Sequence, residues 1–439
     1  MKKEGKKVGV ISLGCDKNRV DTEKMLSILS SEFEITTNVE NANILIINTC
    51  AFLKASRKEA IEEILMAISL KEQGYIEKIV VTGCLPQKFI EEIFNELKEV
   101  DAFLGVSDYD RILQAIERIY SGERVNFVGT PKGEPCTTRV LTTKDYAYLK
   151  IADGCDNHCT YCLIPKIRGK FRSVKKRDLI EESKRLGKVK ELILVAQDIT
   201  KYGCDLEDSE NLVSLIRELS KLDNISKIRL LYCYPENITD ELIEEIKNND
   251  KVIKYIDIPL QHADDKVLKL MNRKGSFNEY LALINKLKNR VDGISIRSTF
   301  ITGFPQESQQ AFDRLVEFLG LAKLSNAGFF KYSREKDTPA DKLDGHLRES
   351  IKTARLKKLY SVQKKVVKEN NKQHLGKTLE VLAEGFDENQ LVYYGRAYFN
   401  APDIDGKVYF FSSEEVVYGE YIPVKINKAT GYDLYGERQ

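Results

Sequence analysis

The first part of the chain, from about Lys7 to Ser121, alternates short apolar runs with stretches of helical period. The runs that predict buried strands are Val8–Leu13, Ile44–Asn48 and Ile79–Thr82. The stretches that predict helices are Asp21–Ser30, Lys54–Lys71 and Gln87–Leu97. Strands that alternate with helices form parallel sheets, because each helix returns the chain to the same edge. The pattern therefore predicts a parallel α/β sheet domain.

A linker with little periodicity follows, from Glu123 to Asp145, and it can include an edge strand at Arg124–Val128. A second alternating region then runs from Tyr146 to about Asn370. Its predicted strands are Ala147–Ile151, Glu191–Ala196, Lys227–Tyr232, Tyr255–Pro259, Gly293–Thr299 and Ala327–Tyr332. Helical patterns lie between them, as at Lys176–Leu186 and Gln309–Leu321, and a long basic helix is predicted at Lys352–Glu369. Six β/α units predict a partial barrel related to the TIM barrel.

The last segment, Gly376 to Gln439, differs in character, because short runs rich in Val, Tyr, Phe and Gly are separated by turn residues. Such runs predict a small antiparallel β-barrel of the oligonucleotide-binding type. The expected fold class is therefore α/β, with a parallel α/β sheet domain at residues 6–122, a partial (β/α)6 TIM-like barrel at 141–370 and a small antiparallel β-barrel at 373–439.

Composition narrows the functional classes. The 439 residues carry a net charge of +2, so the chain lacks the overall basic character expected of a nucleic-acid-binding protein. No apolar stretch approaches the ~20 residues of a membrane span, and the basic start, Met1 to Lys7, leads into a strand without a signal sequence. We therefore expect a cytoplasmic protein. Its nine cysteines are then more typical of metal binding or chemistry than of disulfides.

Three of these cysteines, Cys155, Cys159 and Cys162, lie in one loop after a predicted strand, with Cys-x3-Cys-x2-Cys spacing. A 4Fe–4S cluster usually has four thiolate ligands, so three cysteines leave one iron without a protein ligand. Two alternatives are three small buried residues, or a zinc site in which His158 is the fourth ligand. Zinc sites favour paired Cys-x2-Cys or Cys/His units, so the spacing favours an iron–sulfur cluster.

Three further cysteines, Cys15, Cys50 and Cys84, each follow a predicted parallel strand. Ligands bind at the carboxyl ends of strands in open α/β sheets, so we expect these thiols to converge at one edge and hold a second cluster. Gly14 and Gly83 precede two of them and suit tight turns. The alternative is that they are buried structural residues, since free cysteine is often buried. The other cysteines show no such pattern: Cys136, Cys204 and Cys233.

The loop cysteines, with Tyr161 before the last of them, resemble the signature of radical S-adenosylmethionine (SAM) enzymes. The preceding cysteine triad and the following small barrel resemble the methylthiotransferase family, with its N-terminal cluster domain, radical SAM core and TRAM domain. The resemblance covers nearly the whole chain. It implies two 4Fe–4S clusters and two SAM molecules, one as methyl donor and one as radical source. It also implies a flavodoxin or ferredoxin as electron donor.

Further residues are candidates for SAM binding from their positions near the expected top of the partial barrel, where some follow strands and Arg297 lies within one. The resemblance implies that Gln197 and Asp198 contact the SAM amino group. Arg297, within a predicted strand, is expected to pair with the SAM carboxylate, which the guanidinium fork suits. The remaining candidates are Tyr161, Gln261 and Gly303. Gly303 opens a Gly-Phe-Pro-Gln-Glu segment in which Gln306 replaces the family's second glycine. The alternative for each is a polar loop residue satisfied by its neighbours.

Two motifs resemble the branch of the family that modifies a ribosomal protein (RimO type): Ser12-Leu-Gly-Cys-Asp-Lys-Asn18 and Val195–Gly203. Arg168-Gly-Lys-Phe-Arg-Ser173 also matches, although Val174 stands where that branch has arginine. That resemblance implies thiomethylation of the β-carbon of an aspartate in small-subunit ribosomal protein S-twelve, free or in the ribosome. We expect a monomer with no direct RNA substrate.

The charge of the last segment points the same way. Residues 376–439 contain 11 acidic and 6 basic residues, a net charge of −5. Such a domain repels phosphate and attracts a basic protein. The alternatives are a tRNA adenosine methylthiotransferase, an electron-transfer protein with two clusters and no substrate, and a zinc-stabilised RNA-binding module.

Overall fold

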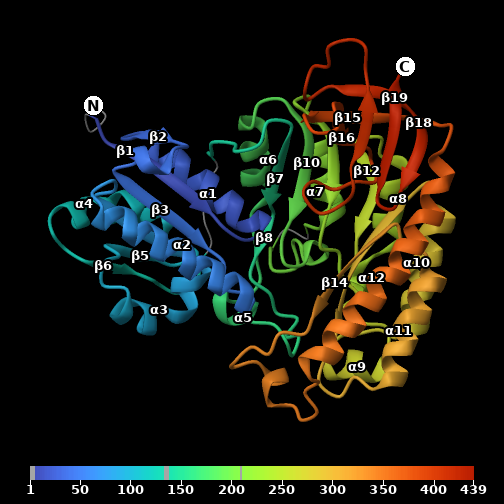
Figure 1. Ribbon diagram of the computed structural model, residues 1–439, viewed down its shortest axis with the longest axis horizontal. Coiled ribbons are helices and arrows are strands. Elements are labelled where there is room, and N and C mark those ends of the chain that lie inside the picture. The colour runs from blue at the N-terminus through green and yellow to red at the C-terminus, as the bar shows by residue number, and fades with distance from the viewer. Residues whose placement is uncertain (1–4, 133–137, 208–209) are drawn as a thin grey trace.

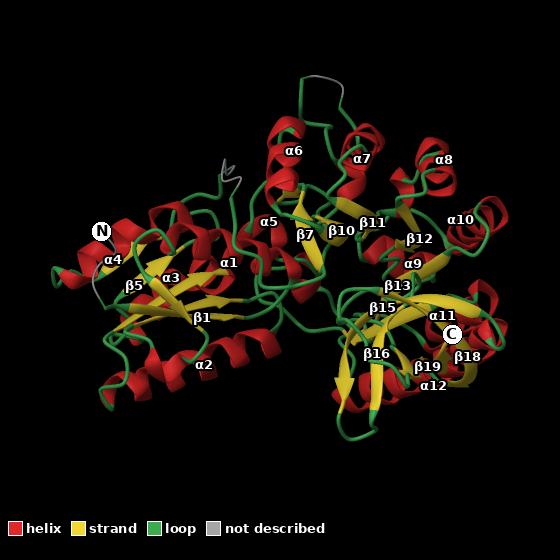
Figure 2. Ribbon diagram, turned by 90° about the horizontal axis from the view of Figure 1, so that it is seen from above, coloured by secondary structure: helices red, strands yellow, loops and turns green. Residues whose placement is uncertain are grey.

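The computed structural model describes residues 5–132, 138–207 and 210–439, so Cys136 lies outside the described residues. The N-terminal part is a six-stranded, wholly parallel sheet of order β2-β1-β3-β4-β5-β6, with helices on both faces (Figures 1 and 2). Its strands are β1 (Lys7–Ser12), β2 (Glu34–Thr36), β3 (Ile44–Thr49), β4 (Lys78–Gly83), β5 (Ala102–Leu104) and β6 (Val125–Phe127). Its helices are α1 (Asp16–Leu29), α2 (Lys54–Glu72), α3 (Cys84–Glu96) and α4 (Ile112–Tyr120).

The central part is a second parallel sheet, of order β14-β13-β12-β11-β10-β7, that curves as an open half-barrel. Its strands are β7 (Tyr146–Lys150), β10 (Val189–Val195), β11 (Ile225–Leu230), β12 (Val252–Asp257), β13 (Ser295–Thr302) and β14 (Asn326–Lys331). Its helices are α5 (Ile164–Ile167), α6 (Lys176–Arg185), α7 (Leu212–Ser220), α8 (Asp240–Asn248), α9 (Asp265–Leu270), α10 (Phe277–Arg290), α11 (Gln309–Ala322) and α12 (Glu349–Asn371).

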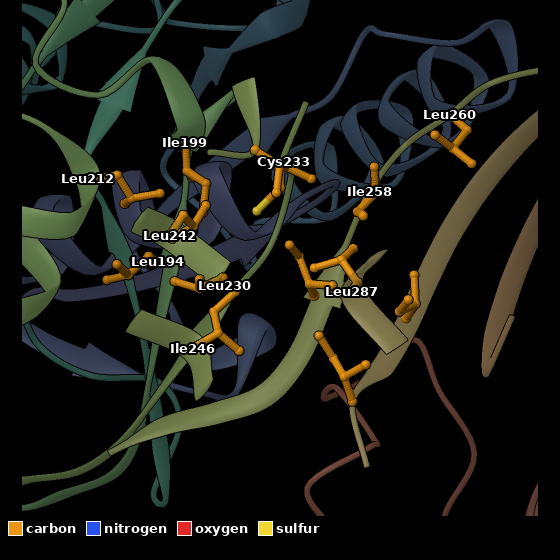
Figure 3. Close-up of a cluster of buried hydrophobic side chains, with 14 of the residues drawn as sticks. Leu194, Ile199, Leu212, Leu230, Cys233, Leu242, Ile246, Ile258, Leu260 and Leu287 are labelled. Atoms are coloured by element: carbon orange, nitrogen blue, oxygen red, sulfur yellow. The ribbon is translucent and has the colours of Figure 1, made fainter. Parts of the chain in front are cut away.

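Short elements complete the central part. A two-stranded ribbon, β8 (Ala152–Asp153) with β9 (Arg172–Ser173), flanks the cysteine loop. Leu194, Leu230 and Ile258 belong to the main core, which fills the space between the half-barrel and its outer helices (Figure 3). The remaining short elements are the 3₁₀ turns η1 (Val39–Asn41), η2 (Tyr109–Arg111), η3 (Ile199–Lys201), η4 (Pro235–Asn237), η5 (Pro339–Lys342) and η6 (Lys372–His374).

The C-terminal part is a closed five-stranded barrel of order β15-β16-β17-β19-β18. Its strands are β15 (Thr378–Asp387), β16 (Val392–Arg396), β17 (Val408–Phe411), β18 (Tyr421–Thr430) and β19 (Asp433–Arg438). The α/β class with a small closed barrel, expected from the sequence, is confirmed. The pairing differs in one respect, because β17 and β19 run parallel and the other pairs are antiparallel.

The barrel reaches into the half-barrel through residues 397–407, which join β16 to β17. Ala401 is buried in an apolar cluster with Val20 of α1 and side chains from the concave face of the central sheet. Asp405 accepts a hydrogen bond from Tyr255 Oη at 2.8 Å, while Asp403 lies 3.6 Å from Arg19 of the N-terminal domain. All three parts of the chain therefore meet at this loop. None of the helices in the described ranges has the length and apolarity needed to cross a bilayer.

Candidate functional site: two groups of three cysteines

The first group of cysteines lies at the carboxyl edge of the N-terminal sheet. Cys15 comes between β1 and α1, Cys50 directly follows β3, and Cys84 is the first residue of α3 after β4. Strands β1, β3 and β4 are parallel neighbours, so their ends meet at one edge. The strand-end pattern in the sequence therefore corresponds to a real spatial grouping of the three segments.

Two glycines bring the three cysteine segments into contact. Gly14 has φ +91°, and a Cβ added there would lie 2.6 Å from Cβ of Cys50. Gly83 has φ +94°, and its added Cβ would lie 2.6 Å from the backbone oxygen of Thr49. These conformations are costly for any other residue, and these distances are too short for a methyl group. The segments of Cys15 and Cys84 thus both pack against the segment of Cys50.

Desolvation dominates the electrostatics of the first group. Burial raises the pKa of Cys84 to about 12 against the opposing effect of Arg168, and the neighbouring Cys50 and Cys15 thiols act in the same direction as burial. Burial also raises the pKa of Cys15, although Cys15 keeps exposed surface and Lys17 opposes the rise. Metal ligation requires thiolates, so a cationic iron would supply the charge that favours deprotonation here.

The second group occupies the loop between β8 and α5. Cys155 and Cys162 accept weak hydrogen bonds from the backbone N–H groups of Asn157, at 3.5 Å, and Ile164, at 3.4 Å. Cys159 Sγ lies 3.6 Å from Tyr234 Oη. Burial raises the pKa of Cys155 to about 11 and that of Cys162 further. The loop therefore presents two buried cysteines, Cys155 and Cys159, and one half-buried cysteine, Cys162, each with a hydrogen-bonding group close to its sulfur.

Both groups fit a cluster better than a single ion. Within the ranges 5–132, 138–207 and 210–439, no three His, Cys, Asp or Glu side chains gather closely enough to bind one metal ion. A tetrahedral zinc site needs its sulfur ligands ~2.3 Å from one metal. In an iron–sulfur cluster the cysteines ligate different irons of a larger body. Thiols that converge without forming a single-ion site therefore suit a cluster.

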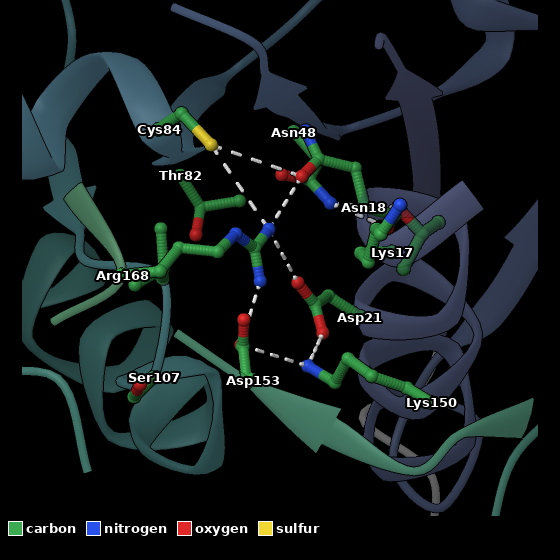
Figure 4. A network of polar contacts seen from close by, with 12 residues as sticks. Lys17, Asn18, Asp21, Asn48, Thr82, Cys84, Ser107, Lys150, Asp153 and Arg168 are labelled. Atoms are coloured by element: carbon green, nitrogen blue, oxygen red, sulfur yellow. Dashed lines mark hydrogen bonds and ion pairs between the residues drawn. The ribbon is translucent and has the colours of Figure 1, made fainter. Parts of the chain in front are cut away.

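A buried ionic network joins the two groups (Figure 4). Arg168 follows α5 and is 1% exposed. Its Nη2 donates to Oδ1 of Asn18 at 2.6 Å and Oδ2 of Asp21 at 3.1 Å, and its Nη1 donates to Oδ2 of Asp153 at 2.8 Å. The same Nη2 lies 4.0 Å from Sγ of Cys84. The guanidinium of Arg168 thus contacts Cys84 of the first group and Asp153, which lies two residues before Cys155 of the second group.

Lys150 and the acidic residues complete this network. Lys150 ends β7 and pairs with both Asp21 and Asp153. Burial alone would raise the pKa of Asp153, but Arg168 and Lys150 outweigh it and hold that pKa well below its usual range. Two cations therefore balance two carboxylates, which is the condition for keeping such charges buried.

The predicted SAM residues Gln197 and Asp198 lie beside the second group. Gln197 Nε2 donates to Asp153 at 2.9 Å, while its Oε1 is buried without a partner among the described residues. Asp198 is buried, accepts from Asn157 at 3.1 Å, and caps η3 through Thr200. Gln197 therefore has a free acceptor suited to an ammonium group, whereas Asp198 is already engaged by its neighbours.

Tyr161 and Gly303 lie close together in the fold. Tyr161 packs edge-on against Phe304, with ring centroids 6.4 Å apart, and the N–H of Gly303 donates to Glu307. Gly303 has φ +77°, and an added Cβ would meet the Lys352 side chain. Gln306, which replaces the family's glycine, still adopts φ +65°. The turn thus keeps a left-handed conformation despite the substitution.

Gln261 and Arg297 have different surroundings. Gln261, half-buried with φ +72°, joins the edge of β13 through its N–H, which donates to the Thr299 carbonyl at 2.8 Å. Arg297 already pairs with Asp257 at 2.9 Å and Asp405 at 3.4 Å. Its guanidinium therefore has two carboxylate partners within the protein. The expectation that it pairs with a ligand carboxylate stays a prediction.

A cavity of about 290 Å³ opens beside the second group and reaches Cys159. It is lined by both cations and carboxylates, among them Lys201, Arg273 and Glu236. Arg273 Nε is buried without a hydrogen-bond partner in the described residues, and its guanidinium stacks over Tyr234. The second cysteine group is therefore accessible from this side.

Known proteins resemble the chain over almost all of its length. It is 47% identical over 438 residues to the ribosomal protein uS12 methylthiotransferase RimO of Clostridium botulinum (strain Eklund 17B / Type B), covering 98% of this chain and 97% of that protein. It is 46% identical over 445 residues to the protein of the same name from Acetivibrio thermocellus, covering 98% of each chain. This chain belongs to the RimO family of methylthiotransferases.

Family models account for the three parts of this RimO-family chain. The model described as the radical SAM superfamily matches residues 149–319, and the TRAM domain model matches 375–438. Residues 7–105 match a model described only as "Uncharacterized protein family UPF0004". The family resemblance inferred from the cysteine motifs is thus confirmed.

Solved structures share the fold at low sequence identity. The radical SAM methyltransferase TsrM from Kitasatospora setae aligns with a TM-score of 0.56 at 13% identity, over 76% of each chain. The cobalamin-dependent radical SAM enzyme OxsB aligns with a TM-score of 0.53 at 12% identity, over 82% of this chain and 58% of that one. At these identities the likenesses show the fold alone.

Sequence reasoning missed the residues that connect the two cysteine groups. Asn18, Asp21 and Arg168 were noticed only as parts of motifs, and Lys150 and Asp153 were given no role. One signal was present: Lys150 lies in a predicted strand that is otherwise apolar, and a charged side chain is rarely buried there unless it has a partner of opposite charge. The partner Asp21 could not be identified, because it lies more than 100 residues away in another domain, whereas Asp153 lies only three residues later.

Proposed function

We propose that this protein transfers a methylthio group to the β-carbon of an aspartate in small-subunit ribosomal protein uS12. The proposal combines two 4Fe–4S clusters with SAM as methyl donor and radical source. The observation that carries it is the pair of three-thiol groups, one at the sheet edge and one in the Cys155–Cys162 loop, joined by a buried network within a RimO-family chain. The proposed domains are residues 6–122, 141–370 and 373–439.

The chain's own residues would divide the work as follows. Cys15, Cys50 and Cys84 would hold one cluster, and the three cysteines of the loop the other, each leaving one iron without a protein ligand. When bound, the clusters and SAM would supply the electron and the radical needed to open an unactivated carbon–hydrogen bond. Gln197 would orient the SAM amino group through its unpaired Oε1. Tyr161, packed against Phe304, would shield the loop from water.

Additional SAM contacts are proposed for Asp198, Gln261, Arg297 and Gly303. Asp198 is buried next to the loop through its bond to Asn157, and Gly303 lies in the turn that holds Phe304 against Tyr161. For Arg297 to bind SAM, its guanidinium would have to release Asp405 or be shared between Asp405 and the SAM carboxylate. Of the four, Asp198 and Gly303 have the better support from their positions.

The barrel would capture the substrate protein. Its net charge of −5 favours a basic partner over RNA. Exposed acidic residues occur along the connection between β17 and β18, including Glu414, Glu415 and Glu420. Val417 and Tyr418 in the same connection are more than half exposed, and they provide apolar area beside these charges. We propose that this face binds uS12 and that the protein has no direct RNA substrate.

The proposal extends to the cellular setting. We infer a cytoplasmic monomer that receives electrons from a flavodoxin or ferredoxin. The cavity beside Cys159, lined by Lys201 and Arg273, would bring such a donor close to the second cluster.

The test is mass spectrometry of uS12 from cells with and without the gene. The expected result is a gain of one methylthio group on the aspartate-bearing peptide, lost in cells that carry Cys50→Ala or Cys159→Ala protein. Cys233→Ala is the matched control, because Cys233 is buried in the main core and belongs to neither group. Thiomethylated tRNA with unmodified uS12 would favour the tRNA adenosine alternative. Failure of reduced protein to cleave SAM would favour an electron-transfer protein.

A further inference from the structure

Arg168 contacts both halves of the candidate site, as Lys150 also does through Asp21 and Asp153, and Arg168 in addition lies 4.0 Å from Sγ of Cys84. Its partners come from two domains: Asn18 and Asp21 from α1, and Asp153 from β8. Every one of these side chains is buried. A guanidinium suits this position, because its planar fork can serve several acceptors in fixed directions. The arrangement is therefore specific to arginine and not only to a positive charge.

On the N-terminal side, the contacts of Arg168 extend to all three cysteine segments. Asn18, which accepts from Arg168 at 2.6 Å, donates to the backbone oxygens of Leu13 and Thr49, both at 3.0 Å. Leu13 lies two residues before Cys15, and Thr49 directly precedes Cys50. The guanidinium itself lies 4.0 Å from Cys84 Sγ. Moving Arg168 would therefore disturb the whole first group.

On the core side, Arg168 holds the beginning of the cysteine loop. Asp153 receives Arg168 on Oδ2, and its Oδ1 accepts from the N–H of Gly154 and from Gln197, both at 2.9 Å. Gly154 directly precedes Cys155, and an added Cβ there would lie 2.0 Å from the Lys170 carbonyl oxygen. The start of the loop thus has little room to move once Asp153 is fixed.

We propose that Arg168 is a positioning residue that sets the spacing between the two iron–sulfur clusters and places a positive charge beside the first. This rests on the proposed function, since it assumes a cluster at each group. The positive charge favours the more negative, reduced form of the first cluster. The fork fixes the geometry through Asn18 and Asp153. The two effects are separable, because lysine keeps the charge and loses the fork.

The experiment uses the full-length protein loaded anaerobically with iron and sulfide, as wild type, R168K and R168Q. The matched control is R229K: Arg229 is also 1% exposed and joins two domains through Glu191 and the Tyr398 carbonyl, yet contacts neither cysteine group. Pulsed electron paramagnetic resonance measures the magnetic coupling between the two reduced clusters. Redox titration measures the midpoint potential of the first cluster, in a background in which the three loop cysteines are alanine.

We expect R168K to change the coupling with little change in potential, and R168Q to change the coupling and lower the potential. R229K should leave both values at the wild-type level. Wild-type coupling in R168K with iron bound at both sites, or wild-type potential in R168Q with iron bound at the first site, would overturn the proposal. If R168Q does not fold, R168K still decides the positioning role.

The positioning role is also measurable without metal. In metal-free R168K protein, hydrogen–deuterium exchange should accelerate in residues 13–18 and in residues 152–155 together, and unchanged exchange in both segments would overturn the proposal. Iron uptake at only one group in the wild-type protein would instead contradict the proposed function. The two failures are thereby distinguishable.

Discussion

Replacement of Gly83 by alanine tests the close approach on which the first cysteine group depends. Gly83 has φ +94° and ψ −148°, a region that only glycine populates readily. Strand β3 runs alongside, with Thr49 directly opposite Gly83 in the sheet. The new methyl group would lie 2.4 Å from Asn48 Oδ1, 2.6 Å from Thr49 O and 3.0 Å from Thr49 N. Two of these three contacts are with backbone atoms, which cannot relieve the overlap by rotating aside as a side chain can.

The magnitude follows from two contributions. The backbone strain costs roughly 1–3 kcal/mol, and forcing a methyl group into a filled space costs about 1–3 kcal/mol more. G83A should therefore lower the free energy of unfolding of the N-terminal domain by about 2–6 kcal/mol. Gly74 provides a matched control, because it has φ +83° in the same domain and an added Cβ there would meet nothing within 4 Å. G74A should cost only about 1–2 kcal/mol.

Urea unfolding followed by circular dichroism, with hydrogen exchange in peptides that cover β3 and β4, measures the difference between the two variants. Because Gly83 directly precedes Cys84, G83A should also take up less iron at the first group, whereas G74A should load as the wild type does. Iron is measured in protein whose loop cysteines are alanine. Equal unfolding midpoints and equal iron uptake in G83A and G74A would refute the reasoning.

Three further predictions concern joints between domains. Burial lowers the pKa of His374 to about 4, so the folded state resists protonation of this side chain. The protein should therefore be fully stable with respect to this group above about pH 6.5 and lose stability as the pH falls toward 4. Urea midpoints should fall by the equivalent of about 2–3 kcal/mol between these pH values, and H374Q should make the fall smaller. Arg297→Gln leaves two buried carboxylates, Asp257 and Asp405, without their cation and should destabilise the protein by about 3–5 kcal/mol, measured by thermal unfolding. Asp403→Asn removes only an exposed pair and should cost less than about 1 kcal/mol in the same assay; a cost as large as that of Arg297→Gln would contradict the burial argument.

The strands of the candidate site were predictable because their signal is local. Apolar runs identified β1, β3 and β4 to within a residue or two, and the rule on strand ends then brought Cys15, Cys50 and Cys84 together. Helix α1 was predicted to begin at Asp21 but begins at Asp16. Its first turns contain buried polar residues that form the domain joint. Hydrophobic periodicity cannot identify a helix whose buried face is polar.

The remaining features depend on contacts that sequence patterns do not contain. The surroundings of Arg297 depend on Asp405, which lies more than 100 residues later in the C-terminal barrel and pairs with it at 3.4 Å, while the pairing of Arg297 with a ligand carboxylate stays a prediction. The parallel pairing of β17 and β19 depends on how the barrel closes, and strand lengths and turn residues in the sequence do not determine that closure. In each case the deciding partner comes from a different domain or from a distant strand.

The loop at residues 397–407 has a consequence for how this chain can be divided or recombined. A C-terminal barrel is usually thought of as an attachable module that could be exchanged to redirect an enzyme to another substrate. Here Ala401 belongs to the lining of the half-barrel, and Asp405 holds Tyr255 and Arg297 in place. A chimera that exchanges the whole barrel would also replace part of the catalytic domain's interior wall. Grafting a new binding surface onto β17–β18 while keeping this loop is therefore the conservative route to altered specificity.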